Sequence, residues 1–127
     1  MDTRSKIIEP DRALELAPGL RAKGVKIVTG YFDVIVAEHV RRLREIKNGS
    51  GALVVVILDP PEALLAGRAR AELVAGLAVV DYVVPADEQA AGELLSHFTA
   101  SEIVREESAD LLRARRLSEH VKSRHQQ

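Results

Sequence analysis

Apolar runs of strand length alternate along the chain with segments in which apolar residues recur every three or four positions. The run 52–58 is almost entirely Val, Ile, Leu and Ala and is bounded by glycine and by prolines, which predicts a central strand covered on both faces. Shorter runs at about 25–29, 79–84 and 101–105 predict three more strands. This alternation is typical of an α/β fold: a small Rossmann-like parallel sheet of about four strands with helices on both faces.

Helical spacing predicts the elements between and after these strands, at about 36–48, 68–78, 86–97 and 107–125. Acidic residues at 87 and 88 suit the first turn of the third of these helices. For the second helix, the residues expected to be buried are Ala69, Leu73, Val74 and Leu77. For the last helix, they are Leu111, Leu112, Leu117 and Val121.

The segment before the first strand predicts a short helix. Pro10 suits a first helical turn, and apolar residues follow it at helical spacing. Pro18 and Gly19 come in the middle of this pattern, and a proline in a helix interior removes a hydrogen bond. We therefore expect one or two turns rather than a long helix.

Length and composition limit the classes of protein that fit. The chain has 127 residues, 46% of them hydrophobic and 29% charged, with no Cys and no Trp, which predicts one globular domain over residues 1–127. A net charge of −1 gives no field to attract nucleic acid or an anionic membrane. Without Cys there is no disulfide, thiolate metal site or Cys nucleophile, and the histidines lack metal-ligand spacing. No apolar run approaches the ~20 residues of a membrane span, so we expect a cytoplasmic protein without membrane, nucleic-acid or metal-site contacts.

The first predicted strand leads into a turn that carries candidate chemistry. Gly30, Tyr31, Phe32 and Asp33 follow the strand, and a predicted helix begins a few residues later. A strand, a glycine turn and a helix start together can present backbone N–H groups to a phosphate. The turn therefore predicts a site for a nucleotide or another small phosphorylated molecule.

Two motifs carry a resemblance to a known family. The first is Gly30-Tyr31-Phe32-Asp33 followed by Val36-Ala37-Glu38-His39, at the place of a Gly-x-Phe-Asp turn and a His-x-Gly-His helix start. The second is Arg70 in a helix that leads into Leu77-Ala78-Val79-Val80-Asp81-Tyr82-Val83-Val84. Over about residues 6–105 the chain resembles the cytidylyltransferase-like nucleotidyltransferases, and most of all the nucleotidyl-transferring domain of heptose-phosphate adenylyltransferases.

The resemblance implies a reaction and a site. Members of the family transfer a nucleoside monophosphate from CTP or ATP, with Mg²⁺, to a small phosphorylated or hydroxylated acceptor. It implies that Gly30, Tyr31, Phe32 and Asp33 surround the nucleotide phosphates, that Arg70 assists them, and that His39 is the catalytic phosphate donor. We also expect a homodimer, and a domain that is truncated at its C-terminus relative to the family.

The helix start departs from the family pattern. Val36 stands for the first histidine and cannot donate a hydrogen bond from its side chain, a loss that commonly costs ~10²–10³ in rate. Glu38 stands for the glycine, and a carboxylate about 4 Å from a phosphate repels it by ~4 kcal/mol at an effective dielectric of 20. Alternatively, Glu38 only stabilises the first helical turn. Two functions therefore stay open: a nucleotidyltransferase, or a non-catalytic nucleotide-binding, regulatory or interaction module.

Other polar residues can be explained by a structural role as well as by a functional one. Asp33 is expected to cap the following loop or helix rather than to act as a base, and Arg70 is alternatively a surface arginine. Asp81 is expected to accept hydrogen bonds from backbone donors at the start of the third strand. The basic run 113–116 shares its predicted helix with the acids Glu106, Glu107, Asp110 and Glu119 and lacks neighbouring aromatics, which favours a solvated helix face over a nucleic-acid contact.

Overall fold

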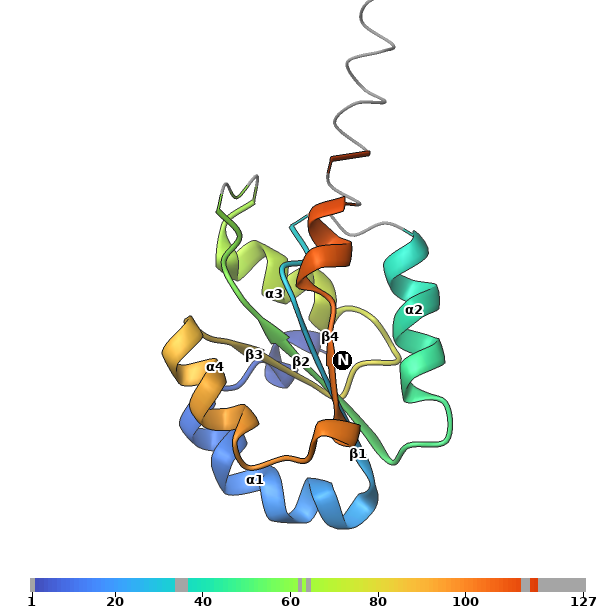
Figure 1. The fold of residues 1–127 in the computed structure, drawn as a ribbon, viewed down its shortest axis with the longest axis vertical. Coiled ribbons are helices and arrows are strands. Elements are labelled where there is room, and N and C mark those ends of the chain that lie inside the picture. The colour runs from blue at the N-terminus through green and yellow to red at the C-terminus, as the bar shows by residue number, and fades with distance from the viewer. Residues whose placement is uncertain (1, 34–36, 62, 64, 113–114, 117–127) are drawn as a thin grey trace, which may run out of the picture.

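The computed structural model describes residues 2–33, 37–61, 63, 65–112 and 115–116. They form a sheet of four parallel strands in the order β3-β2-β1-β4 (Figure 1). The strands are β1 (Val25–Gly30), β2 (Ala52–Ile57), β3 (Tyr82–Pro85) and β4 (Ile103–Arg105). The predicted α/β fold with a small parallel sheet is confirmed.

The central pair of strands explains the apolar runs in the sequence. Every residue of β2 is buried, and β1 and β2 pair in register from Val25 with Ala52 to Gly30 with Ile57. A parallel sheet with helices on both faces leaves its central strands no solvated side, so these strands need apolar residues at successive positions. Because all four strands run the same way, their carboxyl ends meet at one edge.

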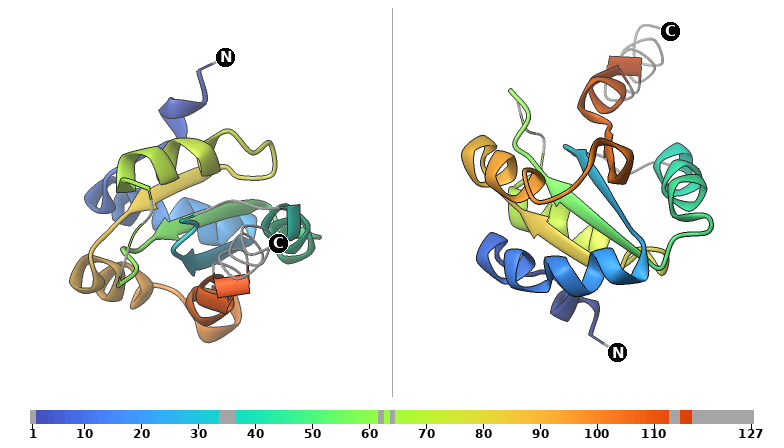
Figure 2. Two further views of the ribbon diagram at one scale, coloured as in Figure 1. Left: turned by 90° about the horizontal axis from the view of Figure 1, so that it is seen from above. Right: turned by 60° about the horizontal axis from the view of Figure 1, so that its bottom comes forward.

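Two pairs of helices cover the two faces. The helices α1 (Pro10–Lys23) and α4 (Glu88–Leu95) pack on one face, and α2 (Ala37–Lys47) and α3 (Gly67–Ala75) pack on the other. In Figure 2, α1 and α4 lie together on one side of the strands and α2 lies on the other. A short 3-10 turn, η1 (Thr3–Lys6), precedes α1.

The prediction that Pro18 and Gly19 limit the first helix to one or two turns is wrong. Helix α1 continues through Pro18 to Lys23 and ends at Gly24, whose φ of +82° is in the left-handed region. Pro18 lies on the exposed side of the helix, where water can replace the hydrogen bond that the proline removes. The opposite face keeps its contacts with the sheet through Ala13, Ala17 and Leu20.

Helix α3 turns inward only part of the expected stripe. Val74 is buried and Leu77 packs against the core, as expected, but Leu73 is 50% exposed. Arg70, Ala71 and Ala75 are buried in addition. The buried stripe begins at Arg70 because the guanidinium satisfies backbone carbonyls under the helix, as described below.

Strand β3 begins three residues later than expected. Residues 79 and 80 lie in the turn before it, and Asp81 ends that turn. As predicted, Asp81 accepts a backbone hydrogen bond, from Leu53 N at 2.8 Å, and it also accepts one from Lys47 Nζ at 2.9 Å.

A capping box leads into β4. The short 3-10 turn η2 (Ala100–Glu102) begins at Thr99, whose backbone N–H donates to Glu102 Oε1 at 2.7 Å. This hydrogen bond, with smaller help from the Arg21 guanidinium, lowers the pKa of the Glu102 carboxyl. The turn brings the chain back to the edge of β1.

A C-terminal helical segment (residues 107–112) follows β4. In Figure 1 it lies above the upper end of β4. The prediction that Leu111 and Leu112 face inward is wrong, since they are 41% and 45% exposed. The side chain that faces inward from this segment is Asp110. Leu117 and Val121 lie outside the described residues.

Over the described part of the chain, we find no helix that combines the length and the apolar character needed to cross a membrane.

Candidate functional site

The site lies at the carboxyl edge of the sheet, where β1 turns toward α2. Gly30 is the last residue of β1, and a Cβ at this position would lie 2.4 Å from Asp110 Oδ2 and 2.7 Å from the Phe32 ring. Only glycine fits such a close approach. Phe32 itself has a φ of +48°, a left-handed conformation that a bulky residue rarely adopts. Its buried ring holds the turn in this shape from below.

The carboxylate of Asp110 occupies the turn. Asp110 Oδ2 accepts hydrogen bonds from the backbone N–H groups of Tyr31 at 2.8 Å and Phe32 at 3.3 Å. Asp110 is 5% exposed, so its carboxylate makes these hydrogen bonds away from water. A segment 79 residues away in the sequence thus supplies an anion to the donors that the strand–turn layout exposes.

His39 also contacts this carboxylate. Its Nε2 lies 2.7 Å from Asp110 Oδ1, and because a carboxylate only accepts hydrogen bonds, Nε2 carries the proton. The imidazole is buried and its ring centroid lies 5.4 Å from that of Phe32, at an angle of 46°. His39 is the third residue of α2, so the start of this helix places the imidazole against the turn that follows β1.

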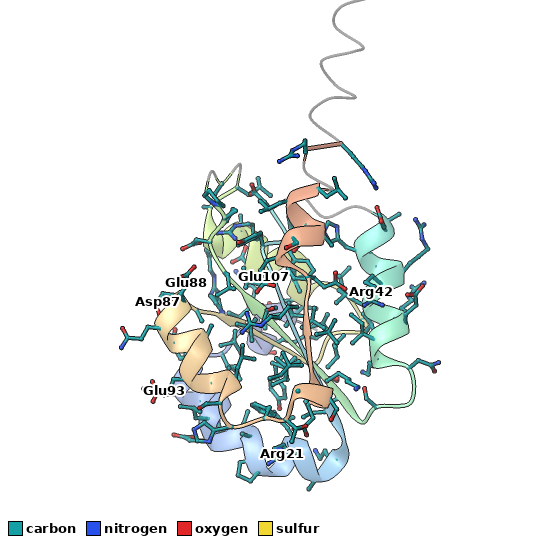
Figure 3. The ribbon with its side chains drawn as sticks, viewed as in Figure 1. Arg21, Arg42, Asp87, Glu88, Glu93 and Glu107 are labelled. Carbon is teal, nitrogen blue, oxygen red and sulfur yellow. The ribbon has the colours of Figure 1, made fainter. Side chains whose placement is uncertain are left out.

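A second contact anchors the C-terminal segment to α2. Glu106 Oε1 accepts from Arg42 Nε at 2.5 Å, and Glu106 N donates to Thr29 O at 2.7 Å. The hydrogen bond that Arg42 donates to Glu106 raises the pKa of Arg42, so the guanidinium stays charged over the physiological range. Figure 3 shows Arg42 on the side of α2 that faces the rest of the fold. Polar contacts therefore fix the segment on both sides of the β1–α2 turn.

Arg70 supports the turn from within the protein. It is 1% exposed, and its Nη1 donates to Tyr31 O at 3.0 Å and to Leu58 O at 2.8 Å. Its Nε donates to Leu65 O at 3.2 Å, and its Nη2 lies 2.5 Å from Asp59 Oδ1. The alternative of a surface arginine is wrong. The guanidinium ties the end of β1 to the end of β2 and to the loop after it.

Asp33 joins the turn to a loop that is distant in the sequence. Its Oδ1 accepts a hydrogen bond from Leu65 N at 2.8 Å, in the loop between β2 and α3. The carboxyl group is buried. The expectation that Asp33 caps the loop or helix that follows it stays a prediction, because residues 34–36 lie outside the described residues.

The predicted site residues can now be placed together. Gly30, Tyr31, Phe32, His39 and Arg70 meet at one place. That they bind a nucleotide, as the resemblance implies, stays a prediction. Glu38 lies in the first turn of α2 with its side chain exposed, and Val36 lies outside the described residues.

Sequence reasoning missed Asp110. It stands beside two leucines in a pattern that favours the leucines as the inward residues. The signal that could have found it is the need of the turn's buried N–H groups for an acceptor.

An adjacent pocket of about 320 Å³ opens between the turn, α4 and the end of β4. Its charged lining residues are Glu88, Arg105 and Glu107, and its other lining residues are Tyr31, Leu58, Ala91, Gly92 and Leu95. Arg105 and Glu107 form an ion pair at 3.4 Å. Figure 3 shows Glu88 on α4 and Glu107 at the start of the C-terminal segment. The residues around this opening thus carry more negative than positive charge.

A metal centre is not built from the described side chains. Among them, no group of three or more His, Asp or Glu residues is placed to hold a metal ion.

Comparison with known proteins finds similarity to one set of longer proteins. No family model matches the chain. Over 110 residues, 80% of this chain, it is 30% identical to the "Bifunctional protein HldE" of Chromohalobacter salexigens. It is 32% identical over 105 residues to the protein of that name from Wolinella succinogenes, and 31% identical over 115 residues to that from Vibrio parahaemolyticus. These matches cover 74% and 82% of this chain.

The chain is therefore weakly homologous, at about 30% identity, to proteins called HldE. It spans only 22% to 24% of the length of these relatives.

Proposed function

We propose that this chain is a cytidylyltransferase-like domain that does not transfer nucleotides and acts as a regulatory or interaction module. The observation that carries the proposal is the Asp110 carboxylate, which lies on the N–H groups of Tyr31 and Phe32 and on His39. The family motifs in the sequence, the parallel α/β sheet and the similarity to HldE proteins support the relationship to nucleotidyltransferases.

The charge of Asp110 opposes a nucleotide at this turn. A phosphate that took the same donors would lie within a few ångströms of the carboxylate, and two such charges about 4 Å apart repel by ~4 kcal/mol at an effective dielectric of 20. A repulsion of that size lowers affinity by about three powers of ten. Nucleotidyl transfer relies on donors that meet the phosphoryl oxygens, and here Asp110 engages those donors.

The helix start after β4 adds to this opposition. Glu107 is the first residue of the helical segment after β4, Glu106 directly precedes it, and Asp110 follows three residues later. Carboxylates at a helix N-terminus interact favourably with its partial positive charge and so take the place of an anionic ligand.

The buried Arg70 fits the same proposal. Its guanidinium donates to the carbonyls of Tyr31, Leu58 and Leu65 and pairs with Asp59. In this arrangement Arg70 is a positioning residue that shapes the turn, rather than a contact to a nucleotide phosphate.

The second candidate is a nucleotidyltransferase that uses CTP or ATP with Mg²⁺. The observation that favours it is the survival of the donor set: the N–H groups of Tyr31 and Phe32 converge with the ring of His39. These donors would hold the phosphates, and Mg²⁺ would neutralise the charge on them. A homodimeric state and a cytoplasmic location stay predictions under either candidate.

The experiment is a search for nucleotidyl transfer by the whole chain. The protein is incubated with Mg²⁺, ATP or CTP, and a panel of sugar phosphates and alcohols, and pyrophosphate release is measured. We expect no release above that of the His39→Ala variant. If the unmodified protein releases pyrophosphate and the His39→Ala substitution abolishes this release, the proposal is overturned in favour of the enzyme.

A further inference from the structure

We propose that residues 106–112 form a displaceable latch on an anion-binding site. In the latched state Asp110 occupies the N–H groups of Tyr31 and Phe32 and the imidazole of His39. When the segment leaves, the same groups bind a phosphate-class anion. This inference rests on the proposed function, because it describes how the closed turn of a non-catalytic module is regulated.

The turn requires an acceptor whether or not the latch is present. The N–H groups of Tyr31 and Phe32 both point at one carboxylate oxygen of Asp110. Buried N–H groups without a partner are rare because their desolvation is not repaid. Removal of Asp110 therefore leaves a preformed set of donors that an external anion can satisfy.

Polar contacts, rather than apolar packing, hold the latch. Its anchors are the ion pair of Glu106 with Arg42, the hydrogen bond from Glu106 N to Thr29 O, and the contacts of Asp110. Its leucines, Leu111 and Leu112, remain substantially exposed, so the segment gains little from the burial of its apolar side chains. An element attached in this way can be exchanged for a competing anion without opening the core.

Competition gives the size of the effect. The apparent dissociation constant of an anion equals its intrinsic constant divided by the fraction of molecules with the latch open. If the latch is open in about one molecule in ten or fewer, removal of Asp110 strengthens anion binding about tenfold or more.

The test is a titration of the full ¹⁵N-labelled chain with inorganic pyrophosphate at pH 7, at an ionic strength fixed with NaCl. The amide signals of Tyr31 and Phe32 report directly on the donors. For Asp110→Ala we expect these two signals to shift saturably, with a dissociation constant at least tenfold below that of the unmodified protein. Glu93→Ala, which removes a carboxylate from α4 and changes the net charge equally, should bind as the unmodified protein does.

A second variant keeps the carboxylate and loosens its anchor. Arg42→Ala removes the partner of Glu106, and we expect an intermediate gain in pyrophosphate affinity. Because this substitution removes a positive charge, the gain cannot arise from net charge. It also guards against the case in which Asp110→Ala does not fold, which circular dichroism would reveal.

Two results would overturn the latch. One is that the Tyr31 and Phe32 signals of folded Asp110→Ala respond to pyrophosphate no more than those of the unmodified protein. If Asp110→Ala does not fold, the same result for Arg42→Ala overturns the latch. The other is an equal gain in Glu93→Ala. Neither result bears on pyrophosphate release in the transfer assay, so failure of the latch and failure of the proposed function are distinguishable.

Discussion

Replacement of Arg70 by Met tests the role of the buried guanidinium in shaping the turn. The substitution keeps an unbranched apolar stem of similar length in a site that is 1% exposed, but removes the donors to Tyr31 O, Leu58 O and Leu65 O. A buried carbonyl that loses its partner costs ~1–3 kcal/mol, so three of them cost up to ~3–9 kcal/mol.

Two terms reduce that figure. Removal of a buried charge recovers its desolvation penalty. Asp59 has a side chain that is 82% exposed, so it returns to water and its ion pair contributes little. We therefore expect Arg70→Met to lower the free energy of unfolding by ~2–4 kcal/mol.

Urea denaturation at 25 °C, followed by circular dichroism, measures the change. With a slope of ~2 kcal/mol/M, the midpoint should fall by ~1–2 M. Arg68→Met is the matched control, because Arg68 lies on the same helix, is exposed and forms an i,i+4 pair with Glu72 at 3.1 Å. That pair contributes ~0.2–0.5 kcal/mol. If both variants unfold at the same midpoint, the guanidinium does not support the turn and the reasoning is refuted.

Three further outcomes are expected. Gly30→Ala places a Cβ 2.4 Å from Asp110 Oδ2, and the displacement should cost ~1–3 kcal/mol in urea unfolding. Glu102→Gln should destabilise the fold by ~0.5 kcal/mol at pH 7; because the folded pKa of Glu102 is lowered, this difference should shrink as the pH falls below the ordinary value of 4.5. Val36→His with Glu38→Gly restores the family signature, yet calorimetry with ATP and Mg²⁺ should detect binding only when Asp110→Ala is added. If the double variant binds ATP without Asp110→Ala, then Val36 and Glu38, and not Asp110, block the turn.

The sheet could be predicted because its physical cause is local in the sequence. Strand β2 is buried on both faces and therefore shows as an unbroken apolar run, and α2 is amphipathic and shows helical spacing. The errors arose where a distant contact outweighed the local preference. Pro18 is tolerated because it lies on the solvent side of α1, and the burial of Arg70 follows from carbonyls just beyond the ends of β1 and β2.

The site could be predicted only in part for a related reason. The glycine turn and His39 are close in the sequence and follow a family pattern, so they could be identified together. Asp110 reaches them from 71 and 79 residues away. No period of apolar residues encodes such a contact, and the neighbouring leucines direct attention to the opposite face of the same segment.

The position of Asp110 explains why this turn can keep its shape without a ligand. In a site that binds phosphate, the backbone donors at the end of β1 face solvent until the ligand arrives, and a bulky residue with positive φ must be held there by its surroundings. In this chain, Asp110 satisfies the donors, Arg70 holds the carbonyl of Tyr31, and the ring of His39 lies against Phe32. The same contacts that stabilise the turn withdraw its donors from an incoming phosphate. Stability of the turn and its availability to a ligand are therefore opposed, and whatever releases the C-terminal segment must also supply an anion to the donors it leaves.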